Sequence, residues 1–157
     1  MIEFFINIIK IFSYFGFFLI GFISSSTIFL PFPIYIISTL SIHFGYNPLL
    51  VAFFTSLGMS FGELTGYFVG FAGYSAYKKI EKNKYYKKFK IWFKKYGDVT
   101  IFIFAFLPLP FDIVGIACGM SKHDIKRFLL FTFFGKFLKM LLIAYGFYEA
   151  EKLLFWN

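Results

Sequence analysis

The chain has 157 residues, of which 59% are hydrophobic, only 15% are charged and 28 are phenylalanine. The 52 residues from Ile11 to Gly62 contain no Asp, Glu, Lys or Arg. An uncharged apolar run of about 18 residues is already typical of a membrane-spanning helix. This composition excludes a soluble globular domain and a disordered chain. A disulfide-stabilised scaffold is also excluded, because the lone Cys118 has no second cysteine to pair with.

The net charge of +8 is concentrated in one segment. Residues 78–95 contain nine lysines and one acid, Glu81, and the rest of the chain sums to zero. Because basic loops of membrane proteins stay on the cytoplasmic side, we expect this segment and the N-terminus in the cytoplasm and the C-terminus outside. No targeting peptide is evident, so we expect a multi-pass protein of the cell membrane that retains its first helix.

The first half of the chain predicts two transmembrane helices around one interrupted segment. Residues 3–24 have the length and hydrophobicity of a transmembrane helix. Residues 27–46 are too short to cross twice and are interrupted by Pro31 and Pro33, which indicates a re-entrant hairpin. A second transmembrane helix is expected at residues 48–77, after a turn that ends in a proline.

The second half repeats this plan after a basic helix. Residues 78–96 alternate rings and lysines at helical spacing, which predicts an amphipathic helix on the cytoplasmic membrane surface with its rings in the lipid. Residues 99–121 form a second expected re-entrant hairpin, interrupted by Pro108 and Pro110. The last transmembrane helix is expected at residues 124–148. Because its rings are expected to face lipid, the basic helix does not indicate nucleic-acid binding.

These segments define the expected fold class. We predict a single all-α integral membrane domain over residues 1–157, an inverted repeat with two opposed re-entrant helical hairpins, transmembrane helices and one interfacial amphipathic helix. Opposed hairpins are typical of transporters whose site lies near the bilayer midplane.

Four charged residues fall within the apolar segments and are the candidate substrate or ion path: Glu63, Asp112, Lys136 and Lys139. Glu63 and Lys136 are each expected near mid-membrane, where a charge is costly unless it is paired or hydrated. The alternative is a structural Glu63–Lys136 pair that only fixes helix packing. Asp112 is either a cation or proton site at the tip of the second hairpin, or the N-cap of the helix that follows.

Four glycines spaced by four residues predict close helix packing: Gly58, Gly62, Gly66 and Gly70. His43 is expected to be a structural or interfacial residue, with a proton relay as the alternative, and His123 to lie at the cap of the last helix. The sequence contains no nucleophile–base pair, metal-ligand spacing, P-loop or dinucleotide motif. We therefore expect no catalytic residues, no metal and no cofactor, and do not expect an enzyme.

Two motifs stand out in the chain. The first runs from Gly58 through Gly62-Glu63-Leu64-Thr65-Gly66-Tyr67 to Gly73, and the second from Phe106-Leu107-Pro108-Leu109-Pro110-Phe111-Asp112 to Gly119. Together they resemble the DedA superfamily, also called the VTT or SNARE-associated domain. The helix from Arg127 to Lys136 resembles the one that follows in the family. The resemblance implies two opposed re-entrant hairpins and lipid scrambling, polyprenyl-phosphate translocation or proton-linked transport.

Many members of this superfamily carry arginine at three positions where this sequence has Ala105, Phe111 and Phe71. The positive charge for an anionic headgroup would then come from Lys136 and Lys139. The leading hypothesis is translocation of a membrane lipid through a groove between the hairpins, with lipids and their anionic headgroups as partners. A proton- or cation-coupled exporter of small solutes and a non-transporting scaffold are the alternatives, and self-association into a homo-oligomer stays open.

Overall fold

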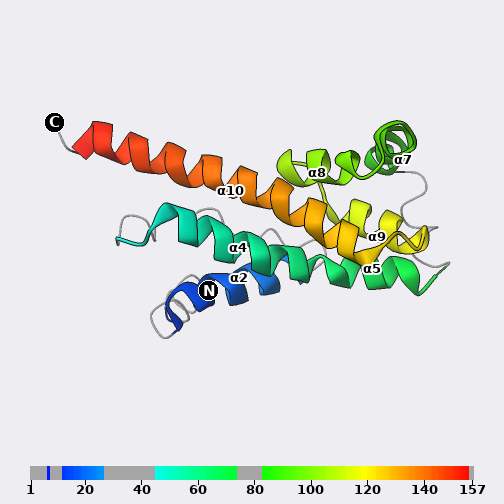
Figure 1. Cartoon of the computed structure of the whole chain (residues 1–157), viewed down its shortest axis with the longest axis horizontal. Coiled ribbons are helices and arrows are strands. Elements are labelled where there is room, and N and C mark those ends of the chain that lie inside the picture. Colours follow the sequence, from blue (N-terminus) through cyan, green and yellow to red (C-terminus); the bar gives the residue numbers. More distant parts are fainter. Residues whose placement is uncertain (1–6, 8–11, 27–44, 74–82, 156–157) are drawn as a thin grey trace.

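Figure 1 shows the computed structural model of the chain, which describes residues 7, 12–26, 45–73 and 83–155. Every regular element in these ranges is a helix. The helices are α2 (Tyr14–Ser26), α4 (Pro48–Gly62), α5 (Leu64–Phe71), α7 (Lys84–Tyr96), α8 (Val99–Phe106), α9 (Asp112–Met120) and α10 (Ile125–Phe155). Pro31, Pro33, His43 and most of the predicted first hairpin lie outside the described residues.

Two long apolar helices run in opposite directions along the molecule (Figure 1). One consists of α4 and α5, 24 residues in all, and the other is the 22-residue stretch of α10 from Ile125 to Gly146. At 1.5 Å per residue each is longer than the roughly 30 Å of a bilayer's hydrocarbon core. Both are therefore long and apolar enough to cross a membrane.

The first long helix starts and ends at identifiable signals. The side chain of Asn47 caps α4 by accepting a hydrogen bond from Leu49 N at 2.9 Å, with Pro48 as the first helical residue. Helical hydrogen bonds continue through Glu63, which separates α4 from α5. The described helix ends at Phe71, before the predicted end at residue 77, and the chain reaches Gly73 with φ +117°.

The short helix α2 begins at the same end of the molecule as α4. The rings of Tyr14 and Tyr46 have centroids 5.4 Å apart, and Tyr14 Oη accepts a hydrogen bond from Asn47 N at 3.1 Å. At its other end, Ser26 O accepts a hydrogen bond from Thr65 Oγ1 at 3.2 Å. The 13 residues of α2, about 20 Å long, therefore stop beside the α4–α5 junction.

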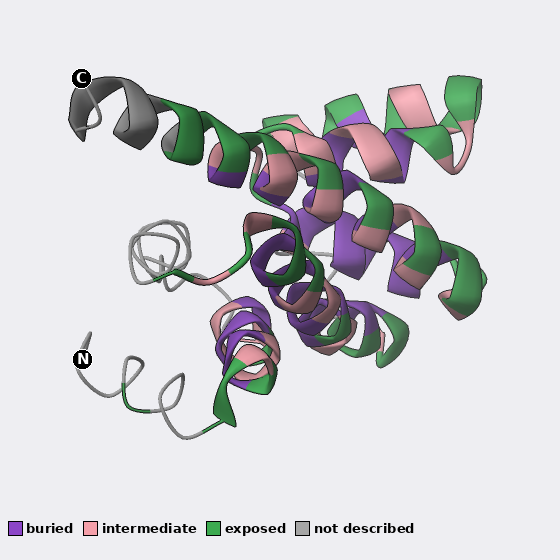
Figure 2. Ribbon diagram, turned by 60° about the vertical axis from the view of Figure 1, so that its left-hand side comes forward, coloured by how far each residue is buried: buried purple, intermediate pink, exposed green. Residues whose placement is uncertain are grey.

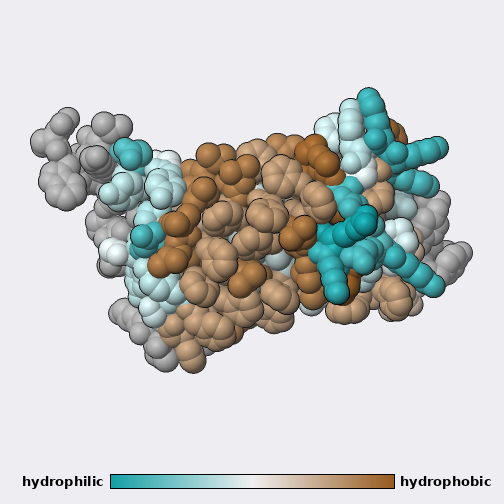
Figure 3. Space-filling model, viewed as in Figure 1, coloured by the Kyte–Doolittle hydropathy of each residue, from teal (hydrophilic) through white to brown (hydrophobic). Residues whose placement is uncertain are grey.

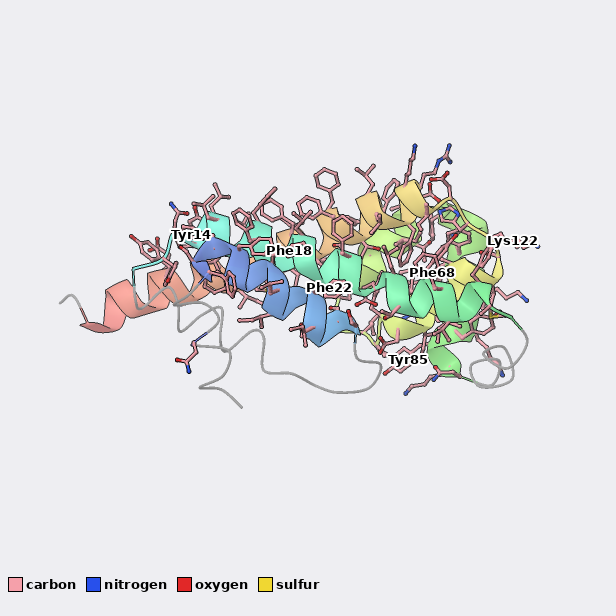
Figure 4. All side chains as sticks on the ribbon, turned by 90° about the horizontal axis from the view of Figure 1, so that it is seen from below. Tyr14, Phe18, Phe22, Phe68, Tyr85 and Lys122 are labelled. Carbon is pink, nitrogen blue, oxygen red and sulfur yellow. The ribbon has the colours of Figure 1, made fainter. Side chains whose placement is uncertain are left out.

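This path departs from the one predicted from the sequence. A helix at residues 3–24 that ended on the membrane face where α4 begins would place residue 24 beside Tyr46 and leave Tyr14 half-way along the molecule. Figure 4 shows Tyr14 at one end, Phe22 near the middle, and Tyr85 and Lys122 toward the other end. The described part of the first segment instead goes halfway along the molecule, and the chain is back at the starting end by Tyr46.

The second proline motif interrupts the chain between α8 and α9. Leu107 precedes Pro108 and is extended, with φ −72° and ψ 155°, because a proline disfavours the helical conformation in the residue before it. Helix α8 packs on α10, whereas α9 packs on α5, and both contact α7. In Figure 1, α8 runs away from the end that carries α7 and α9 returns to it.

Helix α7 is amphipathic, as the sequence predicts, but its aromatic face meets protein rather than lipid. Phe89 is buried, and its ring centroid lies 5.6 Å from that of Phe104 in α8. Trp92 also packs on Phe104, at 6.1 Å, and Phe93 packs on His123 at 5.3 Å. Phe89, and in part Trp92 and Phe93, therefore pack against protein rather than lipid, whereas Tyr96 is 49% exposed.

The surface carries an apolar belt. Figure 3 shows hydrophobic side chains across the middle of the molecule and hydrophilic ones gathered mainly at the end with α7 and the start of α10. The outer faces of the long helices expose large apolar side chains, while their inner faces are buried (Figure 2). An exposed belt of this extent is unfavourable in water and expected in contact with lipid.

Glycines allow the backbones to approach closely at three helix contacts. A Cβ at Gly58 would lie 2.0 Å from Phe18 O in α2, and one at Gly135 would lie 2.6 Å from Phe102 O in α8. In α5, a Cβ at Gly70 would lie 2.1 Å from Ile116 O in α9. The four predicted glycines therefore pack against two different helices: Gly58 and Gly62 face α2, while Gly66 and Gly70 face α9.

We predict that replacing two of these glycines with alanine changes the stability of the protein differently. Gly70→Ala should destabilise the protein by about 1–3 kcal/mol, because backbone must move to admit the methyl group. Gly66→Ala should be neutral or slightly stabilising, because its nearest neighbour is 3.5 Å away and alanine favours helix. Thermal unfolding in detergent tests this, and equal destabilisation by both changes would contradict the packing described.

The last helix starts at a side-chain cap. Asp124 Oδ1 accepts a hydrogen bond from Arg127 N at 2.8 Å. This bond holds the pKa of the Asp124 carboxyl below its usual value of 3.8, because the ionised form is the better acceptor. The cap therefore stabilises the fold above pH 3.8, and its contribution is lost as the pH falls through the lower pKa of the folded state.

We predict that Asp124→Ala lowers the melting temperature in detergent at neutral pH, while Asp124→Asn leaves it close to wild type, because asparagine caps equally well. Below pH 3.8 the wild type should lose stability relative to the Asn variant, which keeps its cap. Parallel losses for wild type and Asp124→Asn over this range would show that the Asp124 cap does not titrate.

Candidate functional site: a buried ion pair between the long helices

A buried ion pair joins the two long helices. Glu63 lies at the α4–α5 junction and Lys136 lies in α10, and α4 packs on α10. Lys136 Nζ donates a hydrogen bond to Glu63 Oε1. Glu63 is 5% exposed and Lys136 is 3% exposed, so both charges are withdrawn from the surface.

Two further groups surround the Lys136 ammonium. It donates a hydrogen bond to Ser25 Oγ, near the end of α2, at 3.2 Å. It also lies 5.3 Å from the ring centroid of Phe111, next to the start of α9. A lysine ammonium has three donors and is attracted to ring faces, so these contacts compensate part of its lost hydration. Lys136 thus links α2, the α4–α5 junction and the proline-broken segment.

One oxygen of the carboxylate has no such partner. Glu63 Oε2 is buried and makes no hydrogen bond within the part of the chain that the structure describes. Because an ionised carboxylate accepts on both oxygens, this atom can take a water molecule, a proton or a donor from a ligand.

The other two predicted path residues lie in the same region. Asp112 is the first residue of α9 and is half-buried, and both Asp112 and Lys139 are close enough to Glu63 to interact with it electrostatically. Lys139 Nζ donates to Leu107 O at 3.5 Å, at the end of α8. The structure therefore gathers Glu63, Asp112, Lys136 and Lys139 around the break that contains Pro108 and Pro110.

Asp112 is not the N-cap that one sequence interpretation suggested. The N-cap position of α9 is Phe111, which makes no side-chain capping bond, and Asp112 follows within the first turn. A carboxylate there is favoured by the positive end of the helix dipole. The role of Asp112 in the site stays a prediction.

Sequence reasoning missed the second partner of Lys136 and several buried hydroxyls. Nothing in the run Ser24-Ser25-Ser26 singled out Ser25, which is 111 residues away from Lys136 in the chain. Hydroxyl-bearing side chains in the long helices are also buried: Thr55, Ser56, Ser60 and Thr132. Clusters of serine and threonine in apolar helices were the only available signal.

His123 belongs to a separate polar cluster. Its Nε2 lies 3.1 Å from Asp98 Oδ1, and Asp98 Oδ2 lies 3.7 Å from the guanidinium of Arg127. Tyr67 Oη donates to the backbone carbonyl of His123, which ties α5 to the start of α10. Among the described residues no group of three or more His, Cys, Asp or Glu side chains is placed to hold a metal ion.

The two halves of the pair have similar surroundings. A Cβ at Gly62 would meet Phe22 O, Ser25 Cβ and Ser26 N, at 2.6, 2.8 and 3.0 Å. One at Gly135 would meet the equivalent atoms of an α8 turn at 2.6, 2.7 and 3.2 Å, from Phe102, Ala105 and Phe106. Each charged residue of the pair therefore follows a glycine that packs against a short helix in the same way.

Two helices long and apolar enough to span a bilayer, with opposite charges paired between them beneath an apolar surface belt, are the pattern expected of an integral membrane protein. The VTT domain model matches residues 11–149, and the chain belongs to this family, the DedA family of membrane proteins commonly linked to transport.

Among similar proteins, one of Methanocaldococcus jannaschii, named Uncharacterized protein MJ0201, is 30% identical over 138 residues, which cover 87% of this chain and 85% of the relative. An uncharacterised protein of Haemophilus influenzae is 24% identical over 97 residues, 59% of this chain and 50% of the relative. No solved structure matches the chain significantly.

We predict that the two charges of the pair are energetically coupled. Glu63→Gln or Lys136→Met alone should cost about 3–5 kcal/mol, because each leaves an uncompensated buried charge. The double variant should be more stable than either single variant, since it removes both charges. A double-mutant cycle by unfolding in detergent measures the coupling, and additive losses would contradict it.

Proposed function

We propose that the protein translocates membrane lipids, by letting a phospholipid headgroup pass the Glu63–Lys136 region while its acyl chains stay in the bilayer. The observation that carries this proposal is the buried pair at the place where α2 ends and the α8–α9 segment breaks. Burying a charge in an apolar region is costly, and this cost favours a role for the pair beyond helix packing.

The chemistry of the four charged residues suits a headgroup. The ammonium groups of Lys136 and Lys139 would attract a lipid phosphate, and the carboxylates of Glu63 and Asp112 would balance them when no lipid is bound. The unpartnered Glu63 Oε2 offers an acceptor for water or for an amine-containing headgroup. Because these groups already interact with one another, a lipid would exchange partners rather than create charge in an apolar medium.

Two features support an arrangement of opposed re-entrant segments. The chain is at the same end of the molecule at Tyr14 and at Tyr46, and both α8 and α9 contact α7 at the opposite end. The matching surroundings of Gly62 and Gly135 support an inverted repeat. In this proposal α2 is the first leg of the first re-entrant segment, and α2 and the α8–α9 segment approach the pair from opposite membrane faces.

We also propose that α7 faces the cytoplasm, since it carries six lysines and no acid. The start of α2 and the C-terminal part of α10 then lie toward the outside, because Figure 1 places them at the other end of the long helices. No chemical step is assigned to the protein, which acts by moving a lipid.

A proton- or cation-coupled exporter is the second candidate function. The observation that favours it is again Glu63 Oε2, because a buried carboxylate oxygen without a partner is a place for a proton or a cation. The two candidates differ in their energy source: an exporter depends on an ion gradient, and passive lipid translocation does not.

The test is lipid scrambling in proteoliposomes with a headgroup-labelled phospholipid and a membrane-impermeant quencher, at zero pH gradient. Wild-type protein should expose labelled lipid of the inner leaflet, and Glu63→Gln and Lys136→Met should slow this at least about tenfold if the charged groups stabilise the passing headgroup by more than about 1.4 kcal/mol. Arg127→Gln is the matched control, because it removes an exposed charge from the same helix.

Each outcome decides between the candidates. Wild-type rates in the folded Glu63→Gln and Lys136→Met proteins would exclude the proposed path. Activity that appears only under an imposed pH gradient would favour the exporter. A charge-reversed pair, Glu63→Lys with Lys136→Glu, that folds and retains full activity would favour a pair that serves packing alone.

A further inference from the structure

Helix α7 and the C-terminal half of α9 leave a groove between them at the lysine-rich end of the molecule. Its volume is about 380 Å³, within the usual range for small-molecule sites. Its walls are mostly apolar and include Phe89, Phe93 and Ala117. Its polar side chains are those of Lys90, Lys94 and Ser121, and Tyr86 also lines it. The residues that line the groove do not include Glu63, Asp112, Lys136 or Lys139.

The two lysines of the groove lie on one face of α7. They are four residues apart, so their side chains are neighbours on the helix surface, and both are exposed. The ion pairs of the described residues join Asp98 to His123 and Arg127, and Glu63 to Lys136, so neither Lys90 nor Lys94 has a described carboxylate partner. Two adjacent ammonium groups at the edge of a groove attract an anion.

The apolar walls determine what kind of anion fits. A free inorganic anion would use the lysines and leave the apolar floor and walls of the groove uncovered. An amphiphile with one acidic headgroup uses both parts, since its phosphate reaches the lysines while an acyl chain lies along the rings. The bilayer would supply such molecules here, because α7 lies at the end of the molecule next to the apolar belt (Figures 1 and 3). Ile91 of α7 is 68% exposed, which is expected beside lipid.

We propose that this groove binds an anionic phospholipid, with the phosphate held by Lys90 and Lys94 and part of one acyl chain over Phe93, where the buried Phe89 and Ala117 form the floor of the groove. The site is additional to the proposed lipid path and does not require translocation. A lipid bound there would contact both α7 and α9, and it would stabilise the packing of α7 over the α8–α9 segment.

The test uses the purified full chain in detergent, with dioleoyl phosphatidic acid as the probe and dioleoyl phosphatidylcholine as the zwitterionic control, measured by native mass spectrometry. Wild-type protein should bind phosphatidic acid preferentially. The double variant Lys90→Gln/Lys94→Gln should weaken this binding about 30-fold, because both phosphate contacts are lost. The matched control Lys84→Gln/Lys95→Gln removes the same charge from α7 outside the groove and should change binding less than about threefold.

A steric variant separates the groove from general surface attraction. Ser121 is exposed, so the Ser121→Phe variant should fold normally while its ring fills the groove. It should abolish the binding of phosphatidic acid without changing the net charge. Lys90→Arg/Lys94→Arg keeps both charges and should retain binding, which guards against loss through misfolding. Equal losses in the two glutamine double variants, undiminished binding by Ser121→Phe, or equal retention of the two lipids would each overturn the proposal.

Discussion

The Glu63–Lys136 ion pair is the interaction on which the arrangement of the helices depends. A lone charge inside an apolar belt is costly, so each of the two residues requires the other within hydrogen-bond distance. The pair therefore fixes where α10 crosses the α4–α5 junction. Each charged residue follows a glycine, and the close approach at Gly62 and Gly135 brings the end of α2 and the end of α8 to the same place. The polar site and the helix packing are thus one constraint.

The interrupted segment between α8 and α9 adds a second requirement, because irregular backbone inside a membrane protein must be covered by protein or water. Here the cover is protein on several sides. Lys139 donates to the carbonyl of Leu107, the Phe111 ring lies against Lys136, and α7 packs its aromatic face over Phe104. The lysines near the break therefore also contact the groups beside the prolines: Lys139 bonds the carbonyl of Leu107, and Lys136 lies over the Phe111 ring.

The polar groups of the protein lie at two levels along its long axis. The Glu63–Lys136 region lies between the long helices and combines charges of both signs, on which the proposed headgroup path rests. The α7–α9 groove lies at the lysine-rich end and combines two cations with apolar walls, which suits a lipid that stays bound. The two levels differ because compensating charge is required only where water is absent.

The sequence by itself determined the features that depend on local chemistry. Pro108 predicted the interruption between α8 and α9, and hydrophobicity predicted two of the long helices, at residues 48–77 and 124–148, since each rule concerns neighbouring residues. The cap of the last helix was predicted at His123, and its capping side chain is that of the next residue, Asp124. The tertiary structure decided what long-range contacts select: the path of α2 beside Tyr46, the bond from Lys136 to Ser25, and the protein partner of the α7 rings. Lipid tails and apolar side chains attract a phenylalanine ring almost equally, so composition could not distinguish them, and only the packed helices could.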